Sequence, residues 1–176
     1  MPRSSPFLVV LLGGAATLSS CLSSGPPAPP VRWFDPTAAF GTAERGSPVE
    51  PVQVRGQSHL VQDIAVRVSP FEIVYDGDHR WLMPPEEILR RAFVHDGVPI
   101  TGAGRLVELT AFELQRSSGA AAARVACLVH PSREGAIAAQ PLEAVVAAPD
   151  DSLPSLTLAM GQAVQQLVTQ IHELPQ

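Results

Sequence analysis

Apolar and polar residues alternate along several stretches of the chain, and a period of two is typical of strands with one buried face. The alternation is clearest at residues 52–55, 64–68 and 71–75; in the last, Phe71, Ile73 and Tyr75 share one predicted face. Further strands are expected at residues 105–115, 122–130 and 136–147, and a short first strand at residues 31–34. Pro141 has no backbone N–H, so it confines the last of these strands to a sheet edge or a bulge.

Two helical patterns interrupt these strands. The first begins at Pro84 and Pro85, carries Glu86 and Glu87 in its first turn and ends near His95. Proline suits the first helical position, and acids favour the positive end of the helix dipole. The order strands, helix, strands, helix predicts an α+β fold: a single two-layer domain whose mostly antiparallel or mixed sheet has about five to six strands, with two main helices.

The second helix is expected from about Ser155 to Glu173. Its apolar stripe at helical spacing predicts packing against the sheet and consists of Leu156, Met160, Val164, Leu167 and Ile171. The other side carries uncharged polar residues: Gln162, Gln165, Gln166, Thr169 and Gln170. This side is interpreted either as a solvated face or as a partly buried surface that contacts another subunit.

The N-terminus has the pattern of an export signal. Arg3 precedes an apolar run over residues 7–18, which is too short for a membrane span of about 20 residues but suits a signal-peptide core. Leu18, Ser19 and Ser20 then precede Cys21. This resembles the lipobox of bacterial lipoproteins, in which the cysteine thiol takes up a diacylglyceryl group. The alternative is an ordinary signal peptide with a chance cysteine.

The lipobox resemblance divides the chain into a signal peptide at residues 1–20, an acylated Cys21 with a proline-rich tether at 21–30, and a domain at 31–176. The tether favours polyproline II at about 3.1 Å per residue. Leu22, where an aspartate would mark retention at the inner membrane, implies delivery to the outer membrane by resemblance to enterobacterial lipoproteins. The predicted location is therefore the outer membrane, lipid-anchored and facing the periplasm.

Composition narrows the function classes. The formal net charge is −5, and loss of Arg3 with the signal peptide makes it about −6. No basic patch is present, so we expect no nucleic-acid partner. If Cys21 carries lipid, Cys127 has no intrachain partner, and its alternation with Val125 and Val129 predicts a buried, apolar role.

No catalytic or metal-binding pattern emerges from the remaining motifs. Asp76, Asp78 and Glu87 match three positions of a calcium loop, but Trp81 stands where that loop requires glycine. The five histidines have neither HExxH nor zinc-ligand spacing. The glycines of residues 97–105 lead into a strand rather than a helix, so they do not form a phosphate loop. We therefore expect no cofactor, no metal and no enzyme activity.

The remaining candidate site is a corner at residues 75–85, where a predicted strand leads into a predicted helix. Asp76 and Asp78 are assigned to a polar turn, and Trp81 is expected to pack where the strand meets the helix. The corner is a candidate partner contact or a structural corner, and its named residues are Tyr75, Arg80, Trp81, Pro84 and Pro85.

Four features, taken together, resemble the ABC-type transport auxiliary lipoprotein family, which includes the PqiC-like proteins. They are the lipobox, the stretch "VQVRGQSHLVQDIAVRVSPFEIVYDGDHRWLMPPEEILRRAF", the "VELTAFELQ" strand and the late helix. The resemblance covers nearly all of the predicted mature chain. Residues 76–79, polar here, and the first strand depart from the family pattern.

The resemblance implies a non-catalytic periplasmic subunit of a system that moves lipids or other hydrophobic substrates between membranes. The implied partners are an MCE-domain (mammalian cell entry) periplasmic protein and its ABC permease and ATPase, and a ring-forming homo-oligomer is left open. Two alternatives remain: a lipoprotein of outer-membrane assembly or lipopolysaccharide insertion, and a periplasmic enzyme.

Overall fold

A computed structural model describes residues 29–41, 53–96, 106–117, 120–131 and 138–174. The predicted signal peptide, Cys21 and most of the tether therefore lie outside the described residues. The described elements, in chain order, are β1 (Arg32–Phe34), the 3-10 helix η1 (Pro36–Phe40), β2 (Gln53–Gly56), β3 (Asp63–Ser69), β4 (Glu72–Trp81), α1 (Pro85–Asp96), β5 (Leu106–Ser117), β6 (Ala120–His130), β7 (Gln140–Ala147) and α2 (Leu153–His172).

The strands form one mixed sheet in the order β1-β4-β3-β5-β6-β7, with β2 also paired to β5. β6 occupies one edge of β5 along its whole length. β2 and β3 therefore lie end to end along the other edge, both parallel to β5: β2 pairs with residues 106–109 and β3 with residues 113–115. The remaining long pairings are antiparallel.

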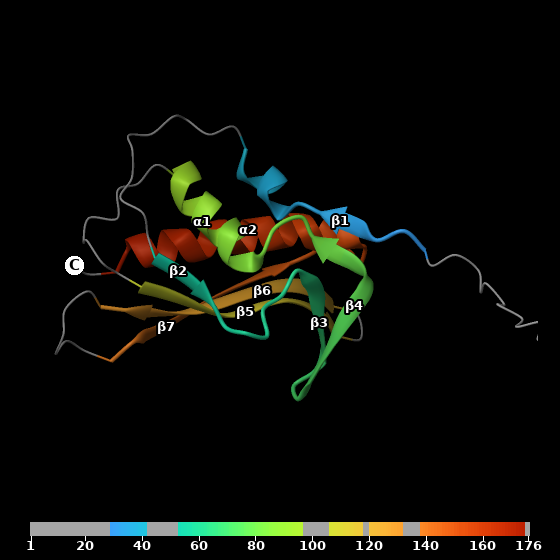
Figure 1. The fold of residues 1–176 in the computed structure, drawn as a ribbon, viewed down its shortest axis with the longest axis horizontal. Helices are drawn as coiled ribbons and strands as arrows, with labels where there is room; N and C mark the ends of the chain where they lie inside the picture. The colour runs from blue at the N-terminus through green and yellow to red at the C-terminus, as the bar shows by residue number, and fades with distance from the viewer. Residues whose placement is uncertain (1–28, 42–52, 97–105, 118–119, 132–137, 175–176) are drawn as a thin grey trace, which may run out of the picture.

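Both α-helices and η1 cover the same face of the sheet (Figure 1). The predicted stripe of α2 is buried throughout, and α2 contacts β6, β7 and η1. Close packing of η1 depends on Gly161, because a Cβ built there would lie 2.3 Å from the carbonyl oxygen of Pro36. None of the described helices is long and apolar enough to cross a membrane.

The predicted α+β domain with a mixed sheet and two main helices is confirmed. The sheet has seven strands, because the three-residue β1 and four-residue β2 both pair within it. Pro141 lies on β7, which is an edge strand as expected.

Two predictions about β4 are wrong. Asp76 and Asp78 lie within the strand, which continues to Trp81: Asp76 pairs with Ile64 of β3, the register shifts after it, and pairing resumes at Arg80 with Asp63 of β3 and at residues 79–81 with β1. The predicted buried face of Phe71, Ile73 and Tyr75 is not formed, since Phe71 is fully exposed where the β3–β4 hairpin turns. Neither helix covers that tip (Figure 1).

Candidate functional site

Trp81 ends β4 and is fully buried beneath the helices. Its ring meets Phe112 edge-on, with centroids 5.4 Å apart and an interplanar angle of 89°. Its backbone N–H donates to the Gln62 carbonyl at 2.7 Å, and the N–H of Leu82 donates to the Phe34 carbonyl at 2.8 Å. The indole N–H is buried without a hydrogen-bond partner among the described residues. Trp81 thus joins the sheet to the helical layer and has no surface to offer a partner.

Pro84 and Pro85 start α1. The carbonyl of Pro84 accepts hydrogen bonds from the backbone N–H groups of Glu87 and Ile88, at 2.9 Å and 3.1 Å. Pro85 is buried and is the first residue of the helix, where its missing N–H costs no helical hydrogen bond. These two prolines fix the direction in which the chain leaves the sheet.

Arg80 is the accessible charged residue of this corner. Its side chain is 41% exposed, and its Nε lies 2.7 Å from Asp63 Oδ1, although the N–H direction does not align for a hydrogen bond. The guanidinium carbon lies 6.0 Å from the ring centroid of Trp33, which is itself 50% exposed. Arg80 and Trp33 face each other in register across β4 and β1. Together they form a small cationic and aromatic surface, which we call the Arg80–Trp33 surface.

Tyr75 does not belong to this surface. It pairs with Ala65 of β3, whereas Arg80 pairs with Asp63 beyond a register shift in that pairing. It is half-exposed, and its hydroxyl donates to the His59 carbonyl at 3.0 Å. Between them, Asp76 accepts from the N–H of Asp78 and lies 2.8 Å from His79 Nδ1. The five predicted corner residues are therefore divided among a buried anchor, a helix start and two separate exposed positions.

A row of alternating charges crosses the sheet face that the helices leave open. The row runs from Arg67 on β3 through Glu113 on β5 and Arg124 on β6 to Glu143 on β7. Arg67 Nε lies 2.6 Å and Arg124 Nη1 2.9 Å from Glu113 Oε1, and Arg124 Nε lies 2.8 Å from Glu143 Oε1. Glu113 is only 2% exposed, so its charge depends on both arginines.

The pKa values follow this arrangement. Burial alone would raise the pKa of Glu113, but hydrogen bonds from Arg67 and Arg124 outweigh it and hold that pKa below its usual value. The hydrogen bond to Glu143 is the largest influence raising the pKa of Arg124, which burial partly opposes. The row stays ionised at neutral pH and cannot supply a proton there.

Sequence reasoning missed this row because the four residues are scattered over 77 positions, 67 to 143. The available signal was weak: each residue occupies a polar position in an alternating strand. Only the register brings Glu113 opposite Arg124, and Arg124 opposite Val145 and next to Glu143.

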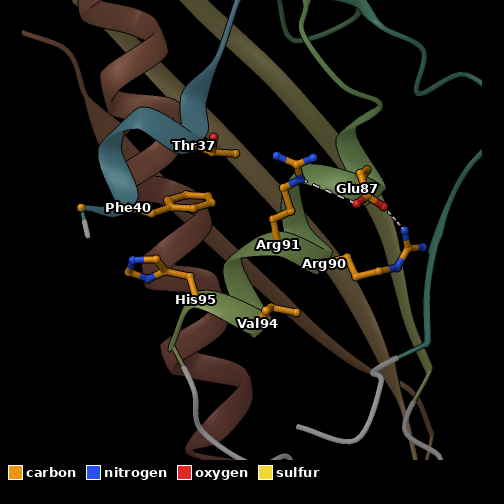
Figure 2. Close-up of a pocket in the computed structure, with 8 residues that line it drawn as sticks. Thr37, Phe40, Glu87, Arg90, Arg91, Val94 and His95 are labelled. Atoms are coloured by element: carbon orange, nitrogen blue, oxygen red, sulfur yellow. Dashed lines mark hydrogen bonds and ion pairs between the residues drawn. The ribbon is translucent and has the colours of Figure 1, made fainter. Parts of the chain in front are cut away.

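A groove lies between η1 and α1, on the helical side of the molecule (Figure 2). It has a volume of 360 Å³ and is lined by Thr37, Phe40, Gly41, Glu87, Arg90, Arg91, Val94 and His95. The ring centroids of Phe40 and His95 are 5.9 Å apart. Sequence analysis did not identify this groove, because η1 is brought against α1 only by its packing on α2.

The described ranges hold no group of three His, Cys, Asp or Glu side chains arranged to hold a metal ion. Cys127 is buried beneath α2, and burial raises the pKa of its thiol to about 12. Such a thiol is almost entirely protonated at neutral pH and is a poor nucleophile.

No family model and no curated protein match the sequence. The fold is shared with solved structures. The crystal structure of protein XCC0632 from Xanthomonas campestris, a DUF330 protein, aligns with a TM-score of 0.54 at 18% identity, over 82% of this chain and 90% of that one. The crystal structure of an uncharacterized protein aligns with a TM-score of 0.51 at 14% identity, over 81% of this chain and 97% of that one. At these identities the likeness shows the fold alone.

Proposed function

We propose that this chain is a lipoprotein anchored in the outer membrane and facing the periplasm, where it serves as a non-catalytic auxiliary component of an MCE/ABC-type lipid transport system. The observation that carries the proposal is the order of its parts. An apolar signal core and Leu18-Ser19-Ser20-Cys21 lead into a proline-rich tether and then a single domain. The resemblance to the ABC-type transport auxiliary lipoproteins supplies the transport role.

The described domain is compatible with a docking role. The Arg80–Trp33 surface lies on β1 and β4, next to the point where the tether enters the fold. Its two side chains are about half exposed, and arginine and tryptophan are the residue types that most often dominate protein interfaces. We propose this surface as the contact with the MCE-domain protein, with Trp81 acting only as the support beneath it.

The anchor is tested by Cys21→Ser. In this variant we expect loss of acylation, loss of signal cleavage at residue 20 and release from outer-membrane fractions, measured by mass spectrometry and membrane flotation. A variant that is still cleaved normally and floats with membranes would refute the lipid anchor.

The partner is tested by affinity purification of the tagged full chain from native membranes in mild detergent. We expect the MCE-domain protein and the ABC subunits to copurify. Arg80→Ala should reduce their recovery while leaving the melting temperature nearly unchanged, because the contacts of Arg80 with Asp63 and Trp33 are both about half exposed. Arg116→Ala is the matched control, since this arginine is exposed and donates a hydrogen bond to the Asp151 carbonyl, away from the Arg80–Trp33 surface. Recovery of outer-membrane assembly proteins without any MCE or ABC subunit would overturn the transport role.

A further inference from the structure

The groove between η1 and α1 places apolar side chains beside an exposed arginine, Arg91. Val94, which is 68% exposed, supplies most of the apolar surface, and Phe40, which is only 6% exposed, lines the groove from the core. A single exposed valine is ordinary on a protein surface. Its position in a groove that also holds an aromatic ring and two arginines is what calls for an explanation (Figure 2).

The two arginines, Arg90 and Arg91, differ in their exposure and in the contacts that they make. Arg90 forms a close ion pair with Glu87, and its Nη2 lies 3.4 Å from the Val54 carbonyl. Arg91 is 58% exposed, and its nearest ion-pair contact is 3.8 Å from Nε to Glu87 Oε1, which is too long for a hydrogen bond. Arg91 makes no hydrogen bond to another described residue and points toward Thr37 in Figure 2. Among the described residues, Arg91 is therefore the less engaged of the two arginines.

The chemistry of this pairing selects an anionic head attached to an apolar chain. A guanidinium matches a carboxylate through two parallel hydrogen bonds. The groove volume of 360 Å³ is near the lower end of the roughly 300–1,000 Å³ typical of ligand pockets. A groove of this volume suits one acyl chain.

We infer that this groove binds a single-chain fatty acid, with the carboxylate on Arg91 and the acyl chain along Phe40 and Val94. The inference rests on the proposed function only in that such a ligand would be met at a membrane. Binding itself requires no partner protein, so it can succeed or fail independently of copurification with a transport system.

The experiment is photo-crosslinking of the full chain in isolated membranes with dodecanoic acid that carries a mid-chain diazirine. We expect saturable labelling of the peptides that contain Phe40 or Val94, located by mass spectrometry. The same chain ending in an alcohol controls for simple partitioning, because it lacks the charge that Arg91 would recognise.

Arg91→Gln should raise the half-saturating concentration of the acid by about tenfold or more, since a charge-assisted hydrogen bond is lost. Arg116→Gln should leave it unchanged. Val94→Gln provides a second variant at an exposed position that folding does not require, and it should also weaken labelling. Labelling outside the groove, equal labelling by the alcohol, or unchanged saturation in Arg91→Gln would each overturn the inference, whether or not MCE proteins copurify.

Discussion

Gly161 allows the close approach of η1 to α2, and Gly161→Ala tests how strongly the fold depends on it. The added Cβ would lie 2.3 Å from the Pro36 carbonyl oxygen and 2.5 Å from the Ala39 Cβ, whereas ordinary contact begins at 3.4 Å. The segment η1 must therefore move by about 1 Å, the difference between 3.4 Å and 2.3 Å, or separate from α2. The nearest obstacle is backbone, which cannot rotate away as a flexible side chain could.

Two opposing effects decide the outcome. Alanine is favoured over glycine in a helix interior by about 1 kcal/mol. Overpacking a well-packed contact costs about 1–3 kcal/mol, and a contact this short belongs at the upper end. We expect a net destabilisation of about 1–2 kcal/mol, which corresponds to a fall in melting temperature of about 2–8 °C for a domain of this size.

The assay is urea and thermal unfolding followed by circular dichroism. Gln162→Ala, at the neighbouring exposed position, is the matched control and should stay within about 0.5 kcal/mol of the parent. Adding Ala39→Gly to Gly161→Ala should recover only part of the loss, because the clash with Pro36 remains. An increase in stability for Gly161→Ala, close to the helix-propensity value, would show that η1 does not pack on α2 as described.

Three further outcomes follow from the charges and the thiol. Glu113→Gln should cost about 2–3 kcal/mol in chemical unfolding because Arg67 and Arg124 lose their shared anion, whereas Glu143→Gln, at the half-exposed end of the row, should cost less than about 1 kcal/mol. Because the folded-state pKa of Glu113 is lowered, its contribution to the free energy of unfolding is complete above pH 4.5 and is lost as pH falls through that folded-state pKa. The stability difference between the parent and Glu113→Gln should therefore shrink over the same pH range. A difference that stays constant with pH would contradict this. Cys127 should resist iodoacetamide in the folded protein and react on unfolding, and rapid alkylation without unfolding would show that its burial is wrong.

Local patterns predicted most of the elements. The i,i+4 spacing of Leu156, Met160 and Val164 identified α2, and Pro84 and Pro85 marked the start of α1 to within one residue. Asp76 and Asp78 misled the prediction, because aspartate and glycine favour turns locally, whereas here the strand accommodates them at a register shift and resumes its pairing with β3 and β1 beyond them.

The candidate sites were less predictable than the elements. Arg80 was identified from its local setting, but its neighbour Trp33 comes from a strand 47 residues earlier, through a parallel register that local patterns do not encode. The groove depends on η1, whose place is set by Gly161 in a helix more than 100 residues away in the sequence. Contacts of this kind follow from tertiary packing, which the period of a single segment cannot report.

The arrangement of β2 and β3 end to end along β5 also constrains the order in which the chain can fold. Both strands precede β5 in the sequence, and their parallel pairing with it joins distant segments, which is slow. The antiparallel β5–β6–β7 unit and α2 are contiguous in sequence and can form first as a template. When the chain is made from its N-terminus, β3 can pair at once with β4, whereas β2 has no pairing strand until β5 is present. Pulsed hydrogen exchange should therefore find the amides of β5 and β6 protected before those of β2, and the reverse order would refute this folding sequence.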